Sequence, residues 1–133
     1  MSEKLAINMI NDLIYADIEL YSLKDSKYYT MAALLDTGAS VTTVSDFVLN
    51  GLGYCTENRT KTVRTANGNI SVCEVVVSEI KLGSLGLANI SVDAHTFPYE
   101  CYFDGILGMN VLSNYNLNID FDNRILELRE RNR

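Results

Sequence analysis

Apolar and polar residues alternate along much of the chain, a pattern with a period of two that indicates half-buried β-strands. The alternation is clearest over residues 14–20 and 88–94. Residues 28–35 are instead apolar at nearly every position, which predicts a central strand covered on both faces. Shorter strands are predicted at 41–44, 60–66, 69–77, 106–107, 116–121 and 124–128.

Turn and cap signals separate these strands. Asn67-Gly68 lies between two of them and is a strong hairpin signal, typical of a type I′ turn with positive φ at both central residues. Ser45 is a suitable N-cap for a short helix over 46–50, and a second short helix is predicted over 109–115. Many short strands and two brief helices indicate an all-β fold, which we expect to be a closed β-barrel in one domain over residues 1–133.

The composition restricts the class of protein. The chain has 133 residues, of which 47% are hydrophobic and one is proline, as in a globular domain. A net charge of −6 disfavours nucleic acid and anionic membranes as partners, and no apolar run approaches the roughly 20 residues of a membrane helix. Residues 1–11 lack the regions of a signal peptide, and the charged residues 129–133 are expected to fray.

The cysteines give no sign of a metal site or of a disulfide framework. Cys55, Cys73 and Cys101 are odd in number and widely spaced, without a Cys-x-x-Cys pair. We therefore expect free thiols in a reducing compartment, the cytoplasm, and neither a metal nor another cofactor.

One short stretch carries candidate chemistry. Residues 34–40 read Leu-Leu-Asp-Thr-Gly-Ala-Ser, so that Asp36 directly follows an apolar pair and precedes a glycine turn. A carboxylate at the end of a buried strand is costly unless donors, a second acid or water accompany it. A second landmark, Gly105-Ile106-Leu107-Gly108, follows about seventy residues later.

Together these landmarks resemble the active-site signature and the hydrophobic-hydrophobic-glycine element of the retropepsin-like (retroviral-type) aspartic proteases, over roughly residues 14–128. The resemblance implies a single acid-protease lobe with a flap hairpin tipped by Asn67-Gly68. It implies that Asp36, Thr37 and Gly38 are catalytic. It also implies that four residues contact an extended peptide substrate, namely Ala39, Asn67, Gly68 and Ile106.

The chain contains a single Asp-Thr-Gly, which points to a homodimer. Hydrolysis by water needs a base and an acid, and two facing carboxylates that share one proton supply both, as is established for aspartic proteases. At roughly 3 Å, two negative charges repel by about 5 kcal/mol at an effective dielectric of about 20. Asp104 lacks the Thr-Gly turn, so Asp36 of a second copy is the expected partner across a two-fold axis.

Other interpretations remain open. The chain could be a protease-like fold with little or no activity that acts as a dimerisation or peptide-binding module, or a small-molecule-binding barrel with an unrelated aspartate. Asp36 could cap a turn, Asn67-Gly68 could be a plain surface hairpin, and Asp104 could be a surface acid or a substrate contact. In the retroviral enzymes a sheet of chain ends locks the dimer, whereas residues 129–133 are mostly charged here, which leaves the dimer interface open.

Overall fold

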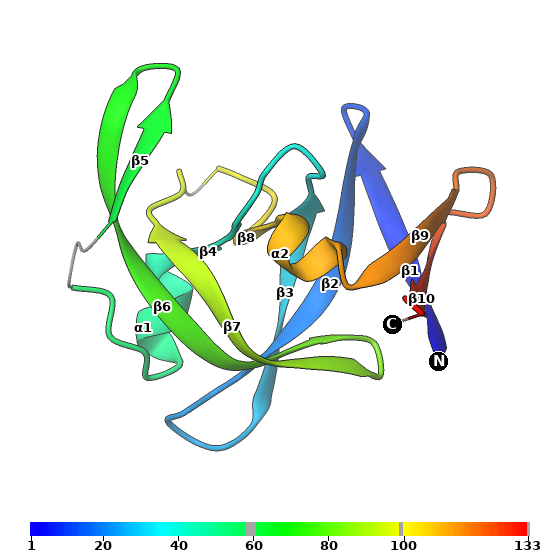
Figure 1. The fold of residues 1–133 in the computed structure, drawn as a ribbon, viewed down its shortest axis with the longest axis horizontal. Coiled ribbons are helices and arrows are strands. Elements are labelled where there is room, and N and C mark those ends of the chain that lie inside the picture. The colour runs from blue at the N-terminus through cyan, green and yellow to red at the C-terminus, as the bar shows by residue number, and fades with distance from the viewer. Residues whose placement is uncertain (58–60, 99, 133) are drawn as a thin grey trace.

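The computed structural model describes residues 1–57, 61–98 and 100–132, and these form ten strands and two short helices (Figure 1). In chain order the elements are β1 (Ser2–Ile10), β2 (Leu13–Tyr21), β3 (Tyr28–Leu35), β4 (Thr42–Ser45), α1 (Asp46–Gly51), β5 (Lys61–Thr65), β6 (Gly68–Leu82), β7 (Leu85–His95), β8 (Gly105–Leu107), α2 (Met109–Leu112), β9 (Tyr115–Asp120) and β10 (Ile125–Glu130). The all-β prediction is confirmed.

Six of the strands close into a ring. Neighbouring strands pair in the order β6, β7, β4, β8, β3, β2, and β2 returns to β6 through Glu19 opposite Lys81 and Leu20 opposite Ile80. The ring can close because β6 is fifteen residues long. It pairs with β5 over residues 68–72 and with β7 between residues 73 and 82, and β2 pairs with residues 80 and 81 on the edge opposite β7. Short β8 is inserted between β3 and β4, parallel to β3 and antiparallel to β4.

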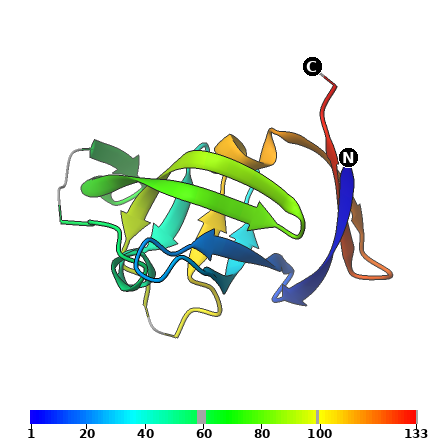
Figure 2. The same ribbon diagram turned by 90° about the horizontal axis from the view of Figure 1, so that it is seen from below.

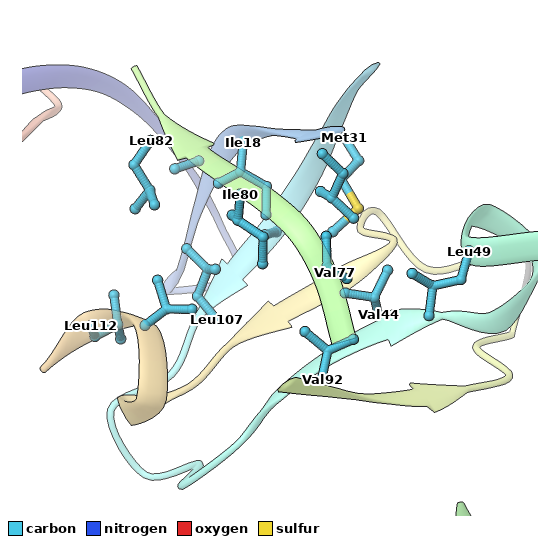
Figure 3. Close-up of a cluster of buried hydrophobic side chains, with 14 of the residues drawn as sticks. Ile18, Met31, Val44, Leu49, Val77, Ile80, Leu82, Val92, Leu107 and Leu112 are labelled. Atoms are coloured by element: carbon cyan, nitrogen blue, oxygen red, sulfur yellow. The ribbon is translucent and has the colours of Figure 1, made fainter. Parts of the chain in front are cut away.

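The hydrophobic core fills the inside of this ring, as Figure 3 shows. Each core strand contributes side chains from alternate positions, as its alternating sequence requires. The largest side chains with less than 2% exposure come from all parts of the ring and from α1 and α2, and include Ile18, Leu20, Val44, Leu49, Val77, Ile80, Leu82, Val92, Leu107 and Leu112.

Strand β3 is central only over its second half. Met31 and Ala33 are buried, but Tyr28 and Tyr29 are 38% and 44% exposed. The first residues of β3 pair with the end of β2 in a hairpin, whereas β8 covers β3 only from Ala33 onward. The apolar character of the whole segment therefore overstated its burial.

The predicted hairpin around Asn67-Gly68 is present and projects from the body at the upper left of Figure 1. Its turn differs from the prediction, because Gly68 has a φ of 111° but Asn67 has no positive φ. Thr65 pairs with Gly68, so the chain reverses at Ala66 and Asn67, and the glycine follows the turn as a left-handed residue. The Thr65 hydroxyl donates to the carbonyl of Gly68 at 2.7 Å.

The sequence prediction missed strand β1. Its first half pairs with β10 and its second half with β2, so it joins two sheets and gives only a weak alternation. β1, β10 and β9 form a three-stranded sheet at one end of the molecule (Figure 2). Arg129 and Glu130 belong to β10, so the predicted frayed tail is wrong for these two residues, while Arg133 lies outside the described residues.

Both predicted helices form. Ser45 caps α1 by accepting the Val48 N–H at 3.4 Å, as expected. Helix α2 ends at Leu112 and not at 115, because the side-chain amide of Asn114 donates to the carbonyls of Asn110 and Val111. In the described ranges no helix is long and apolar enough to cross a membrane.

Candidate active site

Asp36 is fixed where β3 leaves the ring. Its backbone N–H donates to the carbonyl of Leu107 at 3.1 Å, which continues the β3–β8 pairing by one residue. The side chain is half-buried, and its Oδ1 accepts the N–H of Gly38 at 2.8 Å. Ala39 N–H donates back to the carbonyl of Asp36, so residues 36–39 form a compact turn. Thr37 and Gly38 are exposed on its outer side.

Helix α2 braces this turn from behind. The N–H groups of Met109 and Asn110 donate to the carbonyls of Ala39 and Ser40 at 2.7 and 3.1 Å. The first N–H groups of a helix have no partner within the helix, so the turn satisfies donors that would otherwise be unpaired. The Asp36 turn and α2 therefore hold each other in place although about seventy residues separate them.

Only glycine fits at position 108, where the chain that follows the Asp36 turn passes against the start of α2. A Cβ on Gly108 would lie 2.6 Å from the carbonyl carbon of Val41, 2.7 Å from its oxygen and 2.9 Å from the N of Thr42. All three are backbone atoms, so no side-chain rotation can relieve the contact. The glycine of the second landmark thus allows the chain beyond the Asp36 turn to pass close against β8 and α2.

Thr42 and Asn110 complete this support, and sequence reasoning missed both. The buried Thr42 hydroxyl donates to Asn110 Oδ1 at 2.8 Å and accepts the N–H of Gly108 at 3.0 Å. Asn110 Oδ1 also accepts the backbone N–H of Thr42, and its Nδ2 donates to the carbonyl of Ser91 on β7. A side chain on α2 therefore ties β4 to β7 beside the turn.

We expect Thr42→Val to destabilise the protein by about 1–2 kcal/mol, because it leaves the Gly108 N–H without its acceptor and removes one donor to Asn110. Chemical denaturation followed by circular dichroism measures the effect. Thr30→Val is the matched control, since Thr30 is exposed on β3. Equal stability of the two variants would contradict a supporting role for the Thr42 hydroxyl.

A cleft lies between the Asp36 turn and the β5–β6 hairpin. One cavity of about 440 Å³ is bounded by residues 38–41 of the turn and residues 61–63 of β5, with Thr43 and Asp93. A second, of about 240 Å³, has the walls Thr43, Val63, Ile70, Val72, Asp93, His95, Phe97 and Ile106. The two share Thr43, Val63 and Asp93, so they form one continuous hollow under the hairpin.

Some of the predicted substrate-binding residues line this cleft and others do not. Gly38 and Ala39 line the first cavity and Ile106 lines the second. Asn67 and Gly68 are exposed at the hairpin tip and line neither cavity. Sequence reasoning missed the charged cleft residues Lys61 and Asp93, and also His95, which ends β7 and lines the second cavity.

A larger cavity of about 540 Å³ is separate from this site. It lies between α1 and the start of β3, and none of its walls belongs to the Asp36 turn. Asp104 lines this outer cavity and is exposed, in keeping with a surface acid, while its backbone bonds to Ala32 and Ser45. The residues described contain no group of three or more His, Cys, Asp or Glu side chains that could hold a metal ion.

The family and the fold are clear from comparison with known proteins. A family model described as "gag-polyprotein putative aspartyl protease" matches residues 27–114, which include the Asp36 turn, the hairpin and α2. A search of curated proteins finds none that matches the chain.

Two solved structures share the fold. One is a retropepsin-like aspartic protease from Rickettsia conorii, with a TM-score of 0.70 and 20% identity over 96% of this chain and 91% of that one. The other is the retroviral protease-like domain of Ddi1 from Leishmania major, with a TM-score of 0.60 and 14% identity over 90% of this chain and 94% of that one. The chain therefore belongs to the gag-polyprotein aspartyl protease family, with the retropepsin-like fold.

Proposed function

We propose that the protein is an aspartic endopeptidase that works as a homodimer and hydrolyses peptide bonds in extended polypeptides. The observation that carries the proposal is the setting of Asp36, whose carboxylate lies in a braced turn beside a cleft. Among the hydrogen bonds of the described residues, this carboxylate has one partner, the Gly38 N–H of its own turn. It therefore retains acceptor positions for a water molecule and for a second acid.

In the proposed mechanism, the Asp36 side chains of two copies face each other and share one proton. The ionised carboxylate takes a proton from the water as the water attacks the peptide carbonyl, and the protonated carboxyl group donates its proton to the carbonyl oxygen. The C–N bond of the resulting tetrahedral diol then breaks: the newly protonated carboxyl group gives its proton to the departing amine nitrogen, and the other carboxylate takes a proton from a diol hydroxyl as the product acid forms. Thr37 of each copy would brace the turns across the two-fold axis. Gly38 would keep the backbone close to the water.

The substrate would lie extended in the cleft. β5 is an outer strand of the sheet, so its backbone can pair with a peptide by strand addition. The hairpin tip at Asn67 and Gly68 would close over the peptide. Ala39 and Ile106, which line the cavities, would contact its side chains.

The outer edge of β9 offers a surface for the second copy. In an antiparallel pair, every second residue forms hydrogen bonds with the neighbouring strand. The Arg131 N–H donates to the Asn114 carbonyl, so it is the even-numbered residues of β9 that bond to β10. The N–H groups of the odd-numbered residues Tyr115, Leu117 and Ile119 therefore point to the outer edge. β9 directly follows α2, which braces the Asp36 turn. Antiparallel pairing of two β9 edges would create a six-stranded sheet next to both turns.

The side chains of β9 agree with this surface. Leu117 and Ile119 pack on the core but are only half-buried, and a paired strand would cover them further. Tyr115 is buried, and this burial, with the nearby charge of Glu130, raises the pKa of its hydroxyl. Tyr115 therefore stays neutral at physiological pH. The three cysteines are free thiols, which supports the cytoplasm, a reducing compartment, as the proposed site of action.

Mixing wild-type protein with an Asp36→Asn variant tests the homodimer. If one Asp36 from each copy is needed, a threefold excess of the variant should lower the activity of a fixed amount of wild type to about a quarter, because random exchange puts most wild-type copies into mixed pairs. Peptide cleavage is measured after time for subunit exchange, and sedimentation confirms the pairs. Unchanged activity would show that each copy hydrolyses alone.

A further inference from the structure

A partly buried ion pair forms part of the cleft wall. Lys61 Nζ lies 3.1 and 3.3 Å from the two carboxylate oxygens of Asp93, and 3.7 Å from Glu74 Oε2. The side chain of Asp93 is only 10% exposed, against 33% for Lys61 and 46% for Glu74. Glu74 on β6 stands directly opposite Asp93 on β7, so the two carboxylates share one face of the sheet.

This face is the one turned toward the substrate cleft. Asp93 lines both cavities under the hairpin, and Lys61 lines the one that reaches the Asp36 turn. Strand pairing places Lys61 opposite Val72, the position two before Glu74, so all three charged residues lie on the cleft side of the hairpin sheet. Around them the walls are largely apolar, with Val63, Ile70, Val72 and Ile106 among them.

The charges within this group do not cancel. Two carboxylates share one ammonium, so the group carries one uncompensated negative charge at neutral pH. An apolar substrate side chain placed here would take the ions out of water without offering them a partner, which is unfavourable. A basic side chain would supply the missing charge and could donate to both carboxylates.

We propose that Lys61, Glu74 and Asp93 form a subsite that selects a lysine or arginine side chain of the polypeptide substrate. The proposal rests on the proposed function, because it assigns a specificity to the cleft beside Asp36. A purely structural role would be different: the ion pair would then hold β5 against β7 and would affect all substrates alike.

Cleavage of matched peptides tests the subsite. Peptides that differ only in having Arg, Leu or Glu at one position are compared by kcat/KM, with each position near the cleaved bond varied in turn. We expect one position at which Arg exceeds Leu by about tenfold or more, the effect of one charge-assisted hydrogen bond. The absence of any position that favours a basic residue would overturn the proposal.

Two variants assign the preference to these residues. Asp93→Asn should reduce the Arg-over-Leu ratio several-fold, whereas Lys61→Gln should increase it, because the group then carries a second uncompensated charge. The control is Asp17→Asn. It removes an exposed charge from β2, and Asp17 lines neither cavity. A ratio that Lys61→Gln lowers or leaves unchanged, or that Asp17→Asn reduces equally, would contradict the subsite even if Asp93→Asn fails to fold.

The subsite can also be tested if the protein proves to have no protease activity. If the wild type cleaves no peptide, binding of the same peptides to the protein by calorimetry still tests the subsite. Tighter binding of the Arg peptide than of the Leu peptide, with a difference that Asp93→Asn reduces and Lys61→Gln increases, would support it without catalysis. Equal binding of the two peptides would refute it.

Discussion

Replacing Asp36 with asparagine is expected to abolish peptide hydrolysis and to leave the fold intact. Asparagine has nearly the same shape and its side-chain oxygen can still accept the Gly38 N–H, so the turn should persist. It can neither take a proton from water nor share one with a facing carboxylate. Loss of such acid–base catalysis lowers rates by about a hundredfold to ten-thousandfold, and losing both roles at once should reach the upper end.

The measurement is initial-rate cleavage of an unfolded protein such as casein at mildly acidic pH, where one proton on the pair is favoured. Circular dichroism and thermal unfolding check that the variant is folded. Asp17→Asn, an exposed acid away from the cleft, should keep the wild-type rate. An Asp36→Asn protein that cleaves casein as fast as the wild type would exclude the proposed mechanism. A folded wild type that binds but never cleaves would favour the peptide-binding module.

The second large effect is expected for Gly108→Ala. Its new Cβ would overlap three backbone atoms of Val41 and Thr42, so the chain beyond the Asp36 turn would have to move away from α2. Forcing an extra carbon into a packed site typically costs 1–3 kcal/mol, and we expect about 3 kcal/mol here because the neighbours are backbone. Displacing the turn should also remove most of the peptide hydrolysis.

Gly51→Ala is the matched control. It also adds one Cβ to a glycine, but at the end of α1, with nothing within 4 Å and no positive φ. Its free energy of unfolding, measured by denaturant titration, should stay within about 0.5 kcal/mol of the wild type. If Gly108→Ala is as stable and active as Gly51→Ala, the close approach at Gly108 is not required.

The sequence predicts much of this fold because most strands have one apolar face, and the period of two reveals such strands directly. Residues 14–20 and 88–94 show the pattern clearly and lie within β2 and β7. β1 was missed because its alternation is weak where it passes from one sheet to the other. Asn67-Gly68 located the hairpin, but the turn type depends on the pairing of Thr65 with Gly68, which local sequence does not determine.

The candidate site could be predicted only in part, for a related reason. Asp36 stands out because an acid directly follows an apolar run. Thr42 and Asn110 become recognisable only when β4 and α2 are packed together, since their contacts span 68 residues. Asp93 occupies a polar position of an alternating strand, where a surface residue is the ordinary expectation. It is buried because the hairpin strand carrying Lys61 covers that end of β7.

The pairing of Asp36 with Leu107 has a consequence for when the protein gains its chemistry. A growing polypeptide that has emerged only as far as β7 contains the aspartate but lacks β8 and α2, which hold the turn in shape. Contacts between such distant segments form late, because a long loop must close first. The proposed hydrolytic activity would thus arise only after β8 and α2 have been synthesised, so that nascent chains nearby would not be cut before then.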